Sequence, residues 1–148
     1  MEIDDGKAAK VTQKIEITLD SGAGASCWPQ RLLPKVPLRP KAKGMRFKAA
    51  NGTELKYYGT KSIRLTAAGG GGDCGLKFHV TDTTKPLASA MAVTRMGNRV
   101  VLEEGDGKSY IEHIATGKRI LLKEHRGTYV FEAACSVNSV AAVFSGHE

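Results

Sequence analysis

Apolar residues in this chain recur at every second position more often than at helical spacing. The clearest runs are Ile15-Ile17-Leu19, Ile63-Leu65 and Leu76-Phe78-Val80. Alternation with a period of two places one side of an extended chain on a core. Gly, Asn and Asp residues punctuate the runs, as they do between strands. The sequence therefore predicts a mainly β protein.

Length and composition favour one compact domain. The 148 residues are 41% hydrophobic, and no run of 18 apolar residues occurs, so no membrane span is expected. The acidic start, with no apolar stretch, is not a secretory signal, which predicts a cytoplasmic, reducing location. We expect a flexible segment over residues 1–10, a single domain over 11–134 and a tail over 135–148. Cys27, Cys74 and Cys135 are odd in number and widely spaced, so neither a disulfide framework nor a thiolate zinc site is expected.

The excess of positive over negative charge lies in one segment of the chain. The sequence has 22 Lys and Arg residues against 15 Asp and Glu residues, for a net charge of +7. All of this excess falls between residues 31 and 48, a stretch with no acid, in Arg31, Lys35, Arg39, Lys41, Lys43, Arg46 and Lys48. Pro34, Pro37 and Pro40 favour an extended loop here. We expect a solvated surface loop, with contact to RNA or an acidic partner as the alternative.

Turn and capping signals place a hairpin and one helix. Asn51-Gly52 between two strand-like runs predicts a hairpin over residues 45–59, whose central turn residues both accept positive φ. Leu87, Met91, Val93 and Met96 lie along one side of a helix expected after Pro86, with Thr83 or Thr84 as its cap and Gly97 as its stop.

The last third of the chain predicts further strands. They are expected over residues 99–103, 109–115, 118–123 and 128–133, joined by glycine-containing turns. We interpret residues 105–134 as a C-terminal β-meander added to a core over 11–104. Gly69 to Gly72 lacks side chains that could pack and predicts a flexible loop, without the Lys-Ser/Thr of a phosphate-binding loop.

One segment carries a chemical signal. In Ile17-Thr18-Leu19-Asp20-Ser21-Gly22-Ala23 an apolar strand delivers a carboxylate into a tight turn. A buried charge is costly unless neighbours satisfy it, and Ser21 and the Gly22 backbone can supply those hydrogen bonds. Asp-Ser-Gly alone is also a common turn sequence.

The motifs together resemble a known family. Three motifs are similar in order and spacing to those of the retropepsins. They are Asp20-Ser21-Gly22-Ala23 after an apolar strand, Phe47-Lys48-Ala49-Ala50-Asn51-Gly52-Thr53 with Gly59 downstream, and Lys85-Pro86-Leu87-Ala88-Ser89. Retropepsins are aspartic proteases of retroviruses and LTR retrotransposons, and the Copia-like type is the most similar. Pro86-Leu87-Ala88-Ser89 lacks the glycine that many retropepsins carry before the helix.

The resemblance implies a fold, an activity and a site. It implies an all-β acid-protease barrel with one short helix, with Asp20, Ser21 and Gly22 as the catalytic loop. Ala49, Ala50, Asn51 and Gly52 would form the tip of a flap over an extended peptide. The chain would be an endopeptidase that processes a retrotransposon polyprotein, in the cytoplasm and within virus-like particles. A member of this family needs no cofactor.

Such catalysis requires two aspartates. Two adjacent carboxylates cannot both ionise, so one keeps a proton while the other activates a shared water. Only Asp20 lies in an Asp-Ser/Thr-Gly setting, whereas Asp4, Asp5, Asp73, Asp82 and Asp106 do not. The economical solution is a symmetric homodimer in which Asp20 meets its own copy.

Other interpretations stay open at this point. The domain could be an inactive, protease-derived module that contacts RNA or polyprotein through residues 31–48. Cys27 with His79 or His113 could form a thiol protease, although nothing in the sequence brings them together. We expect Cys27-Trp28-Pro29 to pack beneath the catalytic loop and His79 to point into solvent. The spacing of His79, His113 and His125 does not indicate a metal site.

Overall fold

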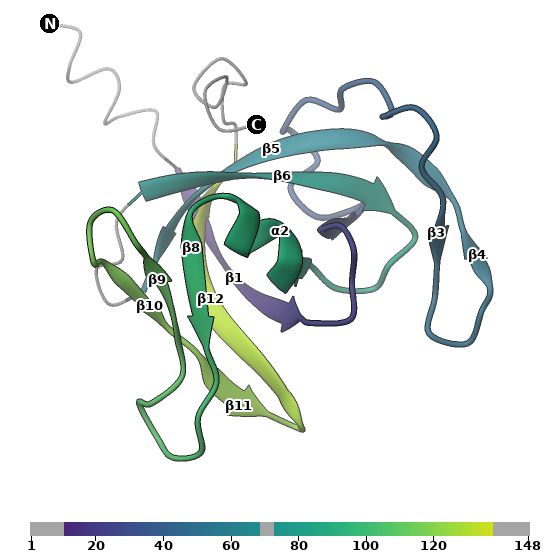
Figure 1. Cartoon of the computed structure of the whole chain (residues 1–148). Helices are drawn as coiled ribbons and strands as arrows, with labels where there is room; N and C mark the ends of the chain where they lie inside the picture. Colours follow the sequence, from purple (N-terminus) through teal and green to yellow (C-terminus); the bar gives the residue numbers. More distant parts are fainter. Residues whose placement is uncertain (1–10, 69–72, 138–148) are drawn as a thin grey trace, which may run out of the picture.

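Strands make up most of the structure, as the alternation predicts, and one short helix accompanies them in the part of the chain described (Figure 1). The computed structural model describes residues 11–68 and 73–137. The elements are β1 (Thr12–Asp20), β2 (Cys27–Pro29), β3 (Phe47–Lys48), β4 (Glu54–Leu55), β5 (Tyr57–Ala67), β6 (Asp73–Thr81), β7 (Leu87–Ser89), α2 (Ala90–Arg95), β8 (Asn98–Val101), β9 (Tyr110–His113), β10 (Arg119–Leu121), β11 (Lys123–His125) and β12 (Thr128–Ser136).

The main sheet closes on itself. Its seven strands follow the order β1-β7-β2-β6-β5-β12-β11, and β12 also pairs with β1. β12 runs antiparallel to β1 from Thr12↔Ser136 to Leu19↔Tyr129, while β7 runs parallel to the last residues of β1. The strand that ends in Asp20 is therefore held on both sides.

The core lies inside this ring and is filled by the alternating residues. Ile17, Ile63 and Phe78 are fully buried, and the Trp28 ring lies 4.8 Å from that of Phe78. Cys27 and Trp28 are also buried, which confirms that the Cys27-Trp28-Pro29 segment packs into the core. Burial of such large apolar side chains contributes about 1.5–3 kcal/mol each relative to exposure.

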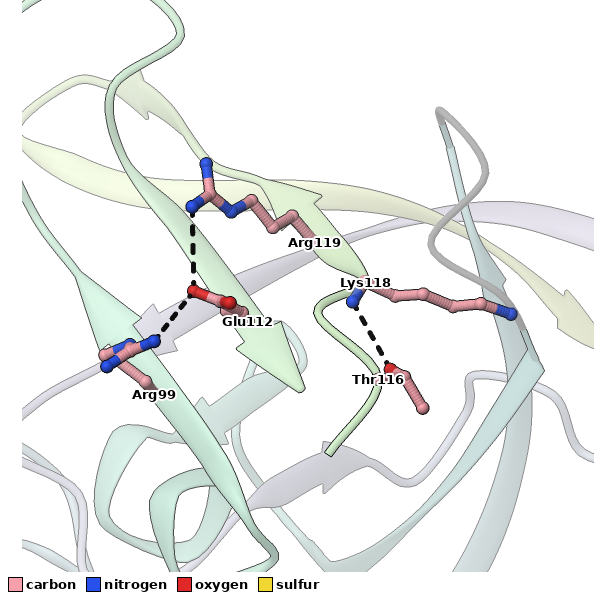
Figure 2. Close-up of polar contacts among 5 residues, drawn as sticks. All are labelled: Arg99, Glu112, Thr116, Lys118 and Arg119. Atoms are coloured by element: carbon pink, nitrogen blue, oxygen red, sulfur yellow. Dashed lines mark hydrogen bonds and ion pairs between the residues drawn. The ribbon is translucent and has the colours of Figure 1, made fainter. Parts of the chain in front are cut away.

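The meander expected over residues 105–134 is separate from the main sheet only at β9 and β10, which pair with β8. β8, β9 and β10 form a three-stranded antiparallel sheet in the order β10-β9-β8. Glu112 on β9 forms ion pairs with Arg99 on β8, at 3.2 Å, and with Arg119 on β10, at 3.7 Å (Figure 2).

β12 differs from the expected extension because it belongs to the main sheet. It pairs with both β1 and β5, and Phe131 and Cys135 are buried in the same core as Ile17. A core limited to residues 11–104 would leave one edge of β1 unpaired. The expected tail also begins too early, since Cys135 is buried within β12.

The helix begins later than the periodicity suggests. Leu87, Ala88 and Ser89 form β7, paired in parallel with β1, and α2 starts at Ala90. Its cap is Ser89, whose Oγ accepts a hydrogen bond from the Ala92 N–H at 3.1 Å, and not Thr83 or Thr84. Pairing with β1 draws Leu87 into the sheet, which local helix signals cannot reveal.

Three expectations lie outside the described residues. They are the N-terminal segment 1–10, the loop Gly69–Gly72 and the tail after residue 137. Within the described ranges, no helix combines the length and the apolar character needed to cross a membrane.

Candidate active site

Asp20 ends β1 and opens a tight turn. Its Oδ1 accepts a hydrogen bond from the Gly22 N–H at 2.9 Å, and its carbonyl oxygen accepts one from the Ala23 N–H at 3.4 Å. The carboxyl is half-buried, whereas Ser21 and Gly22 are exposed. The turn thus holds the carboxylate at the surface, next to two exposed residues.

A buried serine fixes this turn to the rest of the fold. Ser89 is fully buried, and its register partner across the parallel β1–β7 ladder is Asp20. Its Oγ donates to the Ala23 carbonyl oxygen at 2.7 Å, and its N–H donates to Ser26 Oγ at 2.9 Å. The same Oγ caps α2, so the turn and the helix share one anchor.

Sequence reasoning missed this role of Ser89 and Ser26. Ser89 stands directly before the helical run that starts at Ala90, and a serine at that position is a capping signal. The long-range bonds to Ala23 and Ser26 have no local signature, because they join segments more than 60 residues apart.

Cys27 lies near Asp20 but is not an activated thiol. Burial raises the pKa of the Cys27 thiol, a side-chain hydrogen bond with Thr81 opposes this rise, and the negative charge of Asp20 adds to it. A nucleophilic cysteine needs a stabilised thiolate, which is the reverse of this setting.

The pairing of β2 with β6 brings Cys27 beside His79, a proximity that nothing in the sequence indicates. They are direct register partners in a parallel ladder. The His79 Nδ1 is, however, bonded to the Tyr57 hydroxyl at 2.8 Å, while Cys27 Sγ lies 3.9 Å from the Ala25 carbonyl oxygen. The geometry therefore does not favour a thiol protease.

The expected hairpin is present as β3 and β4, with Phe47 opposite Leu55 and Lys48 opposite Glu54. Figure 1 shows it projecting away from the main sheet. Ala49, Ala50, Asn51 and Gly52 form its tip, as the sequence predicts.

The turn type differs from the two-residue turn implied by Asn51-Gly52. The Gly52 N–H donates to the Ala49 carbonyl oxygen at 2.9 Å, and the Ala49 N–H donates to the Thr53 carbonyl oxygen at 2.8 Å. Of the two central residues only Gly52 has a positive φ, of 87°. This is a three-residue loop in which a glycine forms the bulge, and the Asn51 side chain closes it by accepting from the Thr53 N–H.

Aromatic packing holds the base of the hairpin, and here the expectation for His79 was wrong. His79 is half-buried and lies between the rings of Phe47, at 5.3 Å, and Tyr57, at 5.6 Å. The Ala42 N–H donates to the Tyr57 hydroxyl at 2.8 Å, and the same hydroxyl is hydrogen-bonded to His79 Nδ1. Burial and, to a smaller extent, the nearby Lys77 lower the pKa of His79.

The structure groups the candidate residues into two clusters. Asp20, Ser21 and Gly22 share one turn, and residues 49–52 share another. No hydrogen bond among the described residues joins these turns. Asp20 does not line either of two hollows in the described part of the chain, one beside the hairpin and one beside Val93 and Phe131.

Two other described aspartates have partners of their own. Asp82 accepts a hydrogen bond from the Tyr58 hydroxyl, and Asp73 pairs with Arg64 at 3.6 Å. Within the described ranges, no three His, Cys, Asp or Glu side chains lie close enough together to hold a metal ion.

Comparison with known proteins adds no family. No protein-family model matches the sequence, and no curated protein is significantly similar to it.

Proposed function

We propose that the protein is an aspartic endopeptidase that acts as a homodimer, with Asp20 of each chain forming the catalytic pair. The observation that carries the proposal is the Asp20 turn. A buried strand delivers one carboxylate to the surface, where the Gly22 N–H orients it at 2.9 Å and Ser89 holds the turn from below. A carboxylate fixed in this way is suited to reaction with a bound water.

The proposed need for a second copy follows from the aspartates in the part of the chain that the structure describes. Asp73 and Asp82 are engaged by Arg64 and Tyr58, and Asp106 lies in an exposed turn between β8 and β9. The exposed Ser21 and Gly22 leave room for the same turn of a second protomer to approach Asp20 around a two-fold axis. Ser21 would then hydrogen-bond across that axis.

The proposed chemistry is hydrolysis by water. The ionised carboxylate takes a proton from the water as its oxygen attacks the scissile carbonyl carbon, while the protonated carboxyl gives its proton to the carbonyl oxygen. A gem-diol forms. Its C–N bond then breaks, the nitrogen gains a proton, and a carboxylic acid and an amine leave. One proton is shared throughout, so the rate should peak at acidic pH.

The hairpin and the ring of strands are consistent with the retropepsin arrangement. The exposed backbone of residues 49–53 would pair with an extended peptide laid over the Asp20 turn. The closed order β1-β7-β2-β6-β5-β12 supports an acid-protease barrel. By the same resemblance, we propose that the substrate is a retrotransposon polyprotein, cut in the cytoplasm within virus-like particles.

The test compares the wild-type protein with Asp20→Asn on a peptide library and an unfolded protein substrate. Asp82→Asn is the matched control, because Asp82 is an exposed aspartate bonded only to Tyr58 among the described contacts. We expect cleavage by the wild type and the control, and loss of at least roughly 1,000-fold in Asp20→Asn. A transition-state-mimicking inhibitor of aspartic proteases should block the remaining active proteins.

Two outcomes would contradict the proposal. Cleavage that survives Asp20→Asn would show that another group does the chemistry. No cleavage by the wild type at any protein concentration or pH would instead favour an inactive, protease-derived binding module.

A further inference from the structure

The segment 31–48, here called the basic loop, presents unneutralised positive charge. Its cations are all exposed: Arg31, Lys35, Arg39, Lys41, Lys43, Arg46 and Lys48. Within the described residues, none of them forms an ion pair. Arginines elsewhere do, as Figure 2 shows for Arg99 and Arg119 on Glu112.

The backbone of the basic loop is fixed to the main sheet. Leu33 and Val36 are buried, and the buried Lys61 on β5 donates from Nζ to the Leu33 carbonyl oxygen at 2.9 Å. Arg39 exchanges two backbone hydrogen bonds with Thr60, at 2.8 and 3.0 Å. Ordering such a loop on binding costs little, because the fold has already ordered it.

Gly59 makes this attachment possible. A Cβ at residue 59 would lie 2.2 Å from the Arg39 carbonyl oxygen, and its φ is 152°. Only glycine lets the basic loop approach β5 so closely. The cations therefore belong to a built surface of the fold.

A hollow of about 880 Å³ opens between the basic loop and the base of the hairpin. Its cations are Lys41, Lys43, Arg46 and Lys56, and its acids are Glu54 and Asp82. The volume is in the range of sites that take ligands of several hundred daltons. The hollow is open to solvent.

The composition of this surface favours phosphate over protein. Protein interfaces are depleted of Lys at their centre and enriched in aromatic residues and Met. Among the large exposed apolar residues, only Leu38 lies in the basic loop. A run of Lys and Arg without acids is instead the pattern that neutralises a row of phosphates.

We propose that the basic loop and the hollow beside it bind the phosphate backbone of nucleic acid. This function is additional to peptide cleavage and does not depend on it. Recognition would rest on charge, so it would be largely independent of base sequence and would weaken steeply with salt.

The test measures fluorescence anisotropy of a labelled 20-nucleotide single-stranded RNA, and of a duplex DNA, over a series of salt concentrations. The variant combines Lys41→Gln, Lys43→Gln and Arg46→Gln, three exposed side chains without a described partner. For RNA we expect the slope of log K against log salt to shrink by about 2, and affinity at 0.1 M salt to fall roughly 100-fold. Comparison of the two probes shows whether the basic loop binds single-stranded RNA or duplex DNA more tightly.

A matched control removes the same charge elsewhere. Lys85→Gln, Lys108→Gln and Lys123→Gln are exposed and lie outside the basic loop, so this triple variant should keep most of the affinity. RNA binding by the wild type and by both triple variants is also measured with Asp20→Asn added, so that binding is tested without peptide cleavage. Three results would overturn the proposal. They are an affinity for RNA that does not change with salt concentration, an equal loss of affinity in both triple variants, and binding of polyglutamate as tight as that of RNA.

Discussion

At the scale of single residues, a substitution at Gly22 should lower peptidase activity while leaving the stability of the fold almost unchanged. A methyl group at residue 22 would meet only Asp20 Oδ1, at 3.5 Å, which is an ordinary contact. Gly22→Ala should therefore change the free energy of unfolding by less than about 0.5 kcal/mol. Peptidase activity should fall roughly 100-fold, because the methyl group occupies space that substrate and the second turn need beside the carboxylate.

Urea unfolding and steady-state kinetics on the same preparation measure both effects. The control is Gly24→Ala, since nothing lies within 4 Å of a Cβ at residue 24. If Gly22→Ala is as active as Gly24→Ala, no partner approaches the turn.

Substitution of Ser89 should destabilise the fold around the Asp20 turn. Ser89→Ala removes the cap of α2 and the hydrogen bond to the Ala23 carbonyl oxygen, and leaves the Ala92 N–H and that oxygen without this partner in a partly buried place. We expect a loss of about 2 kcal/mol in the free energy of unfolding. Thr94→Ala is the control, since Thr94 Oγ1 is exposed and bonds only the Met91 carbonyl oxygen among the described contacts. Equal stability of the two variants in urea unfolding would remove Ser89 from this role.

At the scale of elements, the base of the hairpin should respond to pH through His79. The folded protein lowers the pKa of His79 below its ordinary 6.5, because burial and Lys77 disfavour the imidazolium. Below pH 6.5 the unfolded chain therefore binds more protons than the folded one, so stability falls as pH drops from 6.5 to the folded pKa. The loss is at most about 1.4 kcal/mol per pH unit.

Urea unfolding at pH 7.5 and 5.5 tests this prediction on the wild type and His79→Gln. The variant should lose less stability between the two pH values than the wild type does. His113→Gln, at an exposed histidine of β9, should behave like the wild type. An unchanged pH dependence in His79→Gln would show that the hairpin base does not sense this proton.

The elements also show what the sequence can and cannot predict. Strands around Ile17, Ile63 and Phe78 follow from local alternation, and the hairpin follows from Asn51-Gly52. The start of α2 was missed because β7 forms through its pairing with the distant strands β1 and β2. The Asp20 turn is visible in the sequence, whereas its support by Ser89 and the burial of His79 come from pairings between distant segments.

At the scale of the whole molecule, the ring of strands gives each chain one carboxylate turn. β12 closes the ring against β1 and β5, so the segment expected as an extension is needed to hold the strand that carries Asp20. In the proposed mechanism a single chain holds half of a catalytic site and has no activity alone. Specific activity should accordingly fall when the protein is diluted below its dimerisation constant.

Mixing wild type with Asp20→Asn at constant total concentration tests the shared site most directly. If a site needs Asp20 from both chains and protomers exchange freely, activity follows the square of the wild-type fraction, so an equal mixture keeps about one quarter of the activity. A linear dependence, with about half the activity in the equal mixture, would mean that each chain holds a complete site and would contradict the account.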